Sequence, residues 1–413
     1  MFHIISYLQF AGRNLRFLSF GFVMLFGSSI GQTYFIGVFG PSIRGEFGLT
    51  HTSWSAIYLA GTLLSALVLS WTGSQIDRVS LTRYATMVIV ALAGAAMFMA
   101  LVPSAVLLIV AIFLLRQTGQ GLMGHTGSTA MARYFPESRG KAVALASLGF
   151  AAGEAMLPVL MVVAISLIGW RGTYGMAALS IVLIVLPAAI WLLKGHQARH
   201  QAHEDRLDVH RQADSQPVAW SRRQVLRDLR FYLLLPAASA PSLIVTALFF
   251  HHLSLAELKG WDATWFTGSY WVYAFGSIFS TLAAGPLIDR LTAARILPTF
   301  LIPMAIGLVL VWTFDSTWWA WAYLFLIGVT GGIAHTGLTA LWAEIYGVKN
   351  LGAIKSLFTS ISVFASALGP LTMGVMMDQG VSIENICAIF AFYCAVTSGL
   401  LVVALKGYKA SFV

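Results

Sequence analysis

Two ionisable side chains lie inside long apolar segments of this 413-residue sequence: Arg116 within 105–131 and Glu154 within 142–167. An ion without a partner at the centre of an apolar span costs at least ~2.5–3.5 kcal/mol. Each side chain must therefore face a polar interior, a wet cavity or a partner. A buried carboxyl group can take up and release a proton, and a guanidinium can pair with a carboxylate or an anionic solute. We expect Glu154 to be a proton-exchanging carboxylate and Arg116 its counter-ion or an anchor for a bound solute.

Other polar side chains occur at depths where an apolar environment tolerates few of them. Hydrogen-bonding groups within the apolar segments should face the interior and contact a solute, and our candidates are Gln32, Thr33, Tyr34, Tyr58, Tyr270 and His251. His125 and His335 occur in a repeated His-Thr-Gly. For these two histidines, a gating or solute-binding role and a hydrogen bond to backbone between closely packed helices are equally plausible interpretations. His251 and His252 close an apolar segment, so an interfacial position is the alternative for them.

The chain contains an internal duplication. The segment 73–83 reappears as 285–295, with five of eleven positions identical. The same offset pairs Tyr58 with Tyr270 and Pro158 with Pro370, far to either side of this segment. A single offset held over such a length predicts that each copy is one structural half.

The composition is that of a membrane protein: 58% of residues are hydrophobic, 10% are charged, and the mean hydropathy is +0.80. A spanning helix needs about 20 apolar residues. We predict an all-α membrane protein with six spans in each half. The twelve predicted spans are 17–39, 53–75, 85–103, 105–131, 142–167, 174–194, 230–253, 264–286, 296–314, 318–345, 355–377 and 384–405.

An even number of spans in each copy makes the halves parallel repeats about an axis along the membrane normal. We expect bundles at 1–194 and 230–413, joined by a cytoplasmic linker at 195–229. With both termini cytoplasmic, the only basic residues in external segments are Arg44, Arg171 and Lys259. This asymmetry is typical of a multi-pass membrane protein. The net charge of +9 therefore reflects the basic residues of the cytoplasmic segments, and we expect no nucleic-acid partner.

The predicted linker carries His196, His200, His203 and His210. A solvated linker is the favoured interpretation, and a metal-binding tract stays open. Cys387 and Cys394 lie seven positions apart in the last span and favour helix packing over a metal site or disulfide. We expect no cofactor and no resident metal.

The duplicated motif Gly-x-x-x-Asp-Arg-x-x-x-x-Arg lies at the predicted cytoplasmic ends of the second and eighth spans. It resembles the loop signature of the major facilitator superfamily, prokaryotic type, and with twelve spans the resemblance covers essentially the whole chain. We expect the glycines to permit close helix approach and the aspartates to face a helix N-terminus. The resemblance implies a cytoplasmic gate between the halves, formed by Gly73, Asp77, Arg78, Arg83, Gly285, Asp289, Arg290 and Arg295.

The fourth span contains Arg-x-x-Gly-x-Gly from Arg116, which looks like the superfamily's fourth-helix signature and implies a link to proton coupling. Antiporter members usually carry Gly-Pro near the point of the fifth helix where this chain has Gly153 followed by Glu154. That departure counts against a drug/proton antiporter. The resemblance also implies a monomer, residence in a bacterial inner membrane, and no enzymatic activity.

The expected function is proton-coupled transport of a small solute by alternating access, with an organic anion slightly favoured because Arg116 occurs in one half only. A copper-type metal importer is one alternative, although 230–286 contains no Met and has histidine only at His251 and His252. A transport-inactive receptor of transporter ancestry is another. A membrane-embedded enzyme is disfavoured, because the short loops carry no nucleophile with a neighbouring base.

Overall fold

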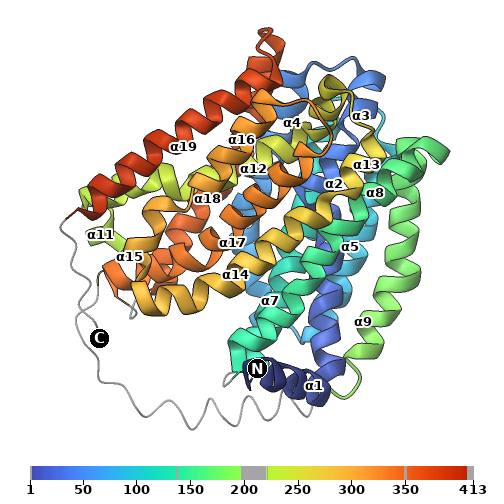
Figure 1. Ribbon diagram of the computed structural model, residues 1–413. Helices are drawn as coiled ribbons and strands as arrows, with labels where there is room; N and C mark the ends of the chain where they lie inside the picture. The colour runs from blue at the N-terminus through green and yellow to red at the C-terminus, as the bar shows by residue number, and fades with distance from the viewer. Residues whose placement is uncertain (1, 136–137, 197–219, 221, 348–350, 407–413) are drawn as a thin grey trace. The chain divides into compact units, whose positions relative to one another are not determined.

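The computed structural model describes residues 2–135, 138–196, 220, 222–347 and 351–406, and this part of the chain is helical without a strand (Figure 1). The linker histidines His200, His203 and His210 lie outside the described residues. The chain forms two compact units, which we describe separately. Unit 1 comprises Met1–Phe47 and Ala60–Ser215, and unit 2 comprises Gly48–Leu59 and Gln216–Val413.

One helix, α4 (His51–Thr72), contributes residues to both units. The remaining elements of unit 1 are α1 (Phe2–Gly27), η1 (Ser28–Gly31), α2 (Thr33–Val38), α3 (Gly40–Phe47), η2 (Gly73–Asp77), α5 (Leu81–Leu101), α6 (Leu107–Leu115), η3 (Arg116–Met123), α7 (Gly124–Tyr134), α8 (Arg139–Ser180), η5 (Ile181–Val185) and α9 (Leu186–Leu192).

Unit 2 consists of the outer part of α4 together with the following elements: α11 (Arg222–Val225), α12 (Leu229–Lys259), α13 (Ala263–Gly268), α14 (Tyr270–Leu291), α15 (Ala293–Ile296), η6 (Leu297–Thr299), α16 (Ile302–Thr313), α17 (Trp319–Tyr346), α18 (Leu351–Asp378) and α19 (Ile383–Leu405). α12 ends at Lys259, further along the chain than the predicted end at 253. Gly260, at φ 65°, takes the left-handed conformation that terminates it.

Within the described part of the chain, eleven apolar helical stretches are long enough to cross a membrane. One of them, Lys141–Leu192, has 52 residues and would be about 78 Å long as a straight helix, more than twice the ~30 Å hydrocarbon core. Gly169 interrupts it with φ 71° and ψ 167°. Division at Gly169 gives two spans, and the predicted twelve-span all-helical architecture is confirmed.

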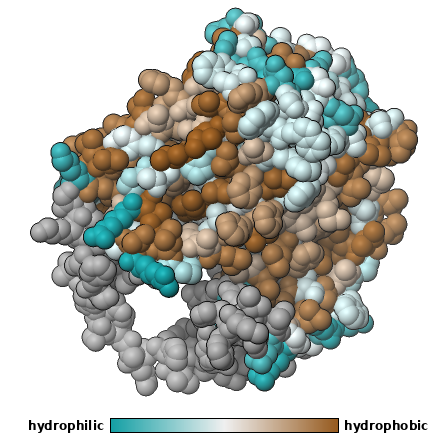
Figure 2. Space-filling model, in the orientation of Figure 1, coloured by the Kyte–Doolittle hydropathy of each residue, from teal (hydrophilic) through white to brown (hydrophobic). Residues whose placement is uncertain are grey.

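The flank of α14 has the character of a lipid-facing surface. Trp271, Phe275, Phe279 and Leu282 are each at least half exposed, and their spacing puts them on one side of the helix. Figure 2 shows mostly hydrophobic residues over α14 and α17 on the face it draws. Exposed apolar side chains in such a stripe are stable against lipid tails but costly in water.

Small residues bring α1 and α8 together in unit 1. A Cβ at Gly149 would lie 2.9 Å from the carbonyl carbon of Phe22, and one at Gly21 would lie 2.9 Å from Ala146. Side chains larger than hydrogen do not fit at these crossings. Close backbone approach is a main source of helix association in an apolar medium, where the hydrophobic effect contributes little.

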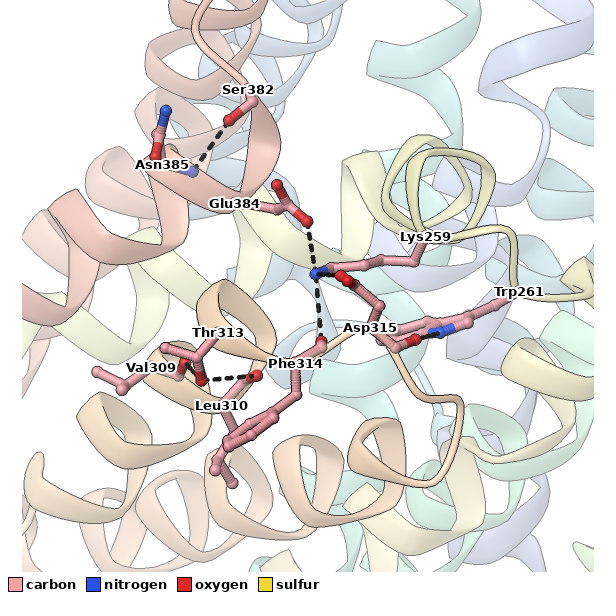
Figure 3. A network of polar contacts seen from close by, with 10 residues as sticks. All are labelled: Lys259, Trp261, Val309, Leu310, Thr313, Phe314, Asp315, Ser382, Glu384 and Asn385. Carbon is pink, nitrogen blue, oxygen red and sulfur yellow. Dashed lines mark hydrogen bonds and ion pairs between the residues drawn. The ribbon is translucent and has the colours of Figure 1, made fainter.

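In unit 2 an ammonium group joins three chain segments at the predicted external ends of their helices (Figure 3). Lys259 Nζ donates to Asp315 at 2.5 Å, to Glu384 at 2.5 Å and to the Phe314 carbonyl at 3.2 Å. Its side chain is only 1% exposed. The indole of Trp261 donates to the Asp315 carbonyl at 2.8 Å. These bonds hold the end of α12, the α16–α17 loop and the start of α19 together.

Unit 1 has a comparable ionic network that joins α3 to α8. Glu46 accepts bonds from Arg171 at 2.6 and 3.0 Å and from the Trp170 indole at 2.6 Å. The same guanidinium donates to the carbonyls of Ala100 and Val102. The hydrogen bonds from Arg171 hold the pKa of Glu46 below its usual value of 4.5, against the opposing effect of burial.

This network predicts a pH-dependent contribution to stability. Because the folded-state pKa of Glu46 lies below the unfolded value, its contribution is complete above pH 4.5 and is lost as the pH falls through the folded-state pKa. We expect Glu46→Gln to lower the melting temperature at pH 7, with a gap to wild type that shrinks below pH 4.5.

Thermal unfolding in detergent between pH 7 and pH 3.5 measures this gap. Glu257→Gln, at an exposed position of α12, is the control and should show no such trend. A gap for Glu46→Gln that stays constant across the range would contradict the assignment.

Candidate functional site

The first membrane span is broken in its middle. α1 ends at Gly27, a 3-10 turn runs from Ser28 to Gly31, and Gln32 is extended at φ −85° and ψ 157° before α2 begins. Gly31 is essential to this geometry, because a Cβ there would lie 2.5 Å from the Gln120 amide nitrogen and 2.9 Å from the Gly119 Cα. The break therefore packs directly against the fourth span.

Arg116 satisfies a carbonyl group at this break. Its side chain is 1% exposed, and Nη1 donates to the carbonyl oxygen of Gly31 at 3.1 Å. Arg116 also opens η3, a π-helical stretch inside the fourth span, and such stretches frequently occur at functional sites. A Cβ at Gly119 would lie 2.6 Å from the Gly31 nitrogen. Arg116 and Gly119, the two defined residues of Arg-x-x-Gly, thus both contact Gly31.

Glu154 lies in α8 and is 6% exposed. The preceding Gly153 packs on Ser29 of the break, where a Cβ would lie 2.9 Å from the Ser29 Cβ. Within the described part of the chain Glu154 makes no hydrogen bond or ion pair, so it is not joined to Arg116. Arg116 and Gly153, the residue before Glu154, each contact the broken helix, and the structure does not form the ion pair between Arg116 and Glu154 that we considered as one alternative.

The other predicted polar groups of the first span surround the same break. Tyr34 is buried, and its hydroxyl donates to the Ser29 hydroxyl at 2.8 Å. Its ring contacts Phe150 of α8 edge-on. Gln32 and Thr33 are half-buried. Ser29 and Tyr34 therefore form a polar pair that packs against α8, the helix that carries Glu154.

Gln117 is a site residue that the sequence analysis missed. Its amide accepts a bond from Ser65 at 3.0 Å and donates to the Thr72 hydroxyl at 2.7 Å. These bonds fix α4 to η3 beside Arg116. Gln117 could have been found from the sequence, because it is a polar residue directly after an arginine in an apolar span.

Unit 2 contains a second buried polar group, centred on His252. Nδ1 lies 2.8 Å from the Tyr270 hydroxyl and Nε2 lies 2.7 Å from the Tyr323 hydroxyl. All three side chains are at most 1% exposed. A neutral imidazole has one donor and one acceptor nitrogen, so one tyrosine donates while the other accepts. The interfacial position considered for His252 is wrong, and Tyr270 is occupied by this bond.

His251 is also buried, at 3% exposure. Its Nε2 lies 3.1 Å from the carbonyl oxygen of Pro370 and 3.3 Å from the Ser55 hydroxyl. A carbonyl oxygen can only accept, so the bond to Pro370 requires hydrogen on Nε2. The neighbouring Phe250 packs on Tyr58 at 4.6 Å between ring centroids. Tyr58 and His251 thus belong to the packing of unit 2 around the outer part of α4.

The two repeated histidines differ from these, because His125 and His335 are exposed. His125 Nδ1 lies 3.4 Å from the Thr129 hydroxyl. The structure leaves their gating role as a prediction. Among the described residues no three His, Cys, Asp or Glu side chains come together as a metal site.

The two glycines of the duplicated gate motif have no close contact within their own units. A Cβ at Gly73 would lie 3.7 Å from the His125 ring, an ordinary contact, and one at Gly285 would meet no described atom within 4 Å. Within its own unit neither glycine makes a close approach to a described neighbouring helix, and the close approach expected at the gate stays a prediction. Gly73 lies in η2 and is buried, whereas Gly285 lies on an open side of α14.

The structure describes some of the charged side chains of the motif. The Asp77 and Asp289 side chains lie outside them, so their proposed helix contacts stay predictions. The four arginines are exposed: Arg78, Arg83, Arg290 and Arg295. A carboxylate does cap a helix here, but it belongs to Glu344, which accepts from the Ala293 and Ala294 amides at 2.7 and 3.1 Å.

The crossing at Gly31 generates a stability prediction. We expect Gly31→Ala to destabilise the protein by about 1–3 kcal/mol, because the added methyl group overlaps the backbone of the fourth span. Gly94→Ala is the matched control, since a Cβ at that position of α5 meets no described atom within 4 Å. Thermal unfolding of both variants in detergent tests this. Equal melting temperatures for the two variants would contradict the crossing.

Comparison with solved structures shows the same fold. A crystal structure of a bacterial homologue of the human lysosomal transporter Spinster, inward-facing and occupied, matches with a TM-score of 0.72 at 13% identity and covers 96% of this chain and 97% of that chain. The nucleoside transporter NupG matches with a TM-score of 0.70 at 12% identity, covering 96% and 99%. No curated protein matches the sequence significantly.

Family comparison agrees with the architecture of twelve spans in duplicated halves. The family model described as Major Facilitator Superfamily matches residues 21–370 and 263–410, which together include nearly the whole chain. This chain belongs to the Major Facilitator Superfamily and is a membrane transporter.

Proposed function

We propose that this transporter moves a small solute by alternating access and that a proton gradient drives it through Glu154. The observation that carries the proposal is the burial of Glu154 beside a broken helix without a cationic partner among the described residues. In an apolar interior a charged carboxylate without a partner costs far more free energy than a neutral carboxyl group. Binding a proton offsets that cost, and access to water favours its release.

The broken first span supports a binding role for the same region. Discontinuous helices expose backbone polar groups at membrane depth and commonly form the substrate and ion sites of transporters. Here the break places Ser29 and Tyr34 next to the helix that carries Glu154. We propose that a solute binds at this region, with Gln32 and Thr33 as further contacts.

We propose that the solute is an organic anion. An organic anion is favoured only by Arg116, whose guanidinium donates to the Gly31 carbonyl. We propose that Arg116 first holds the helix break and attracts an anion from that position. Transport of an anion should then be more sensitive to Arg116→Gln than transport of a neutral solute, because glutamine keeps a hydrogen-bond donor but removes the positive charge.

Two functional alternatives can be separated by experiment. A receptor of transporter ancestry would bind a solute without moving it, so flux distinguishes it from a carrier. A copper-type importer gains no support from the described residues, which hold no cluster of three His, Cys, Asp or Glu. We further propose a monomer in a bacterial inner membrane with cytoplasmic termini, a topology supported by the distribution of basic residues.

The proposal predicts that Glu154→Gln separates exchange from accumulation. A glutamine keeps the size of the side chain but cannot carry a proton, so the variant should exchange solute across the membrane without concentrating it. The measurement is flux in proteoliposomes with and without a pH gradient, on solutes first selected by thermal shift from a panel of organic anions, sugars, nucleosides and amino acids.

Glu257→Gln, an exposed carboxylate of α12, should accumulate solute as wild type does. Uphill transport by Glu154→Gln equal to wild type would place the proton site elsewhere. Solute binding with no flux in the wild type would favour the receptor.

A further inference from the structure

Exposed cations lie on both helices where α1 and α9 meet in unit 1. Arg13 and Arg16 lie in the first half of α1, and Lys194 follows directly after the end of α9. The two helices pack against each other, and Figure 1 shows α9 ending close to the first turns of α1. Both helices therefore contribute positive charge to the same end of the unit.

The guanidinium of Arg16 is held on Trp191, in the last turn of α9. Its Nη2 donates to the Trp191 carbonyl oxygen at 2.5 Å, and its central carbon lies 5.2 Å from the centroid of the indole ring. The last carbonyl groups of a helix lack partners within the helix and carry partial negative charge, which explains this bond. The contact gives a defined position to a side chain that is otherwise exposed.

Most donors of this guanidinium remain open. Arginine has five N–H donors, and the bond to Trp191 is the one hydrogen bond that the Arg16 side chain makes within the described residues. The backbone amide of Lys194 donates to the same carbonyl oxygen at 3.2 Å. The exposed Lys194 side chain therefore starts beside the guanidinium, and the two groups can contact the oxygens of one anion.

The chain provides no counter-ion to these cations within its described residues. The sequence contains no Asp or Glu from 1 to 45 or from 155 to 203. By contrast, the cations Arg171 and Lys259, in predicted external segments, each bond to a carboxylate of their own unit. The partner that fits Arg16 is therefore an anion from outside the chain.

An exposed apolar flank leads along η5 and α9 to the same place. Leu183, Ile184, Ile190 and Trp191 are each at least two-fifths exposed. In a membrane such side chains contact lipid tails, and tryptophan is enriched at the depth of the lipid headgroups. An acyl chain can thus lie along this flank while its headgroup reaches Arg16.

We propose that Arg16 and Lys194 bind the phosphate of an anionic phospholipid, with Trp191 positioning the guanidinium and the flank of η5 and α9 holding an acyl chain. The planar guanidinium offers paired donors to phosphate oxygens, and the ammonium adds a point charge. Arg13 adds positive charge close by in the sequence. A lipid fits both the cations and the apolar flank, whereas a soluble phosphate fits the cations alone. This lipid site involves neither Glu154 nor the transported solute.

Titration of the purified full-length protein with dioleoyl phosphatidylglycerol, followed by native mass spectrometry, measures the affinity of the first bound lipid. Phosphatidylcholine, which has no net charge, should bind more weakly. Arg16→Gln should weaken phosphatidylglycerol binding about fivefold or more, because it removes one cation near the headgroup, and Lys194→Gln should also weaken it. Arg227→Gln, at an exposed position of unit 2, is the matched control and should leave the affinity unchanged.

Two variants that keep the net charge distinguish a built site from general attraction to a basic surface. Arg16→Lys loses the paired planar donors, and Trp191→Leu loses the ring on which the guanidinium lies, so both should weaken phosphatidylglycerol binding. Trp318→Leu removes another exposed indole, in unit 2, and should have no effect. Wild-type affinity in both Arg16→Lys and Trp191→Leu would overturn the site.

The melting temperature of each variant in detergent without added lipid reports its folding. If Arg16 only caps α9, Arg16→Gln will melt earlier yet bind phosphatidylglycerol as the wild type does, which would contradict the site. If that variant does not fold, Lys194→Gln decides, because its backbone bond to Trp191 remains, and unchanged lipid affinity there would also contradict the site. Thermal stabilisation by inorganic phosphate equal to that by phosphatidylglycerol would show a soluble-anion site and refute the lipid assignment.

Discussion

The bond between the Arg116 guanidinium and the Gly31 carbonyl is the contact on which the centre of unit 1 depends. In a membrane interior, both a broken helix and a cation must be satisfied by protein groups, because lipid offers no hydrogen bonds. The break at Ser28–Gly31 leaves the Gly31 carbonyl in need of a hydrogen-bond donor, and the buried Arg116 guanidinium needs acceptors for its N–H groups. Gly119 and Gly31 bring the two backbones close enough for this bond to form.

The two repeats use the same fold for different polar centres. Unit 1 holds a carboxylate and a guanidinium at a helix break, whereas unit 2 holds an imidazole between two phenol groups. In unit 2 His252 lies in a continuous α12, and its hydrogen bonds reach Tyr270 of α14 and Tyr323 of α17. Duplication thus conserved the helix arrangement, and the buried side chains diverged. This difference favours unit 1 as the site of proton exchange.

Much of the fold followed from the sequence because span length and hydrophobicity are local properties. The division of residues 141–192 at Gly169 could be foreseen from two apolar segments separated by a short gap. The burial of Arg116 followed from its position in an apolar span. Its hydrogen-bond acceptor, the Gly31 carbonyl, could not be predicted, because every residue has a backbone carbonyl and the sequence does not show which one is free. The separation of Glu154 from Arg116 depends on helix rotation, where each residue turns the side chain by about 100°. The burial of His251 and His252 was missed because α12 extends beyond its predicted end.

The central claim is that Glu154 exchanges a proton when the transporter works. The most direct test measures proton uptake or release by purified protein in weakly buffered solution when a transported solute binds. We predict a proton change near one per protein for the wild type and none for Glu154→Gln, with solute binding retained in both. An equal proton change in the two proteins would contradict the account.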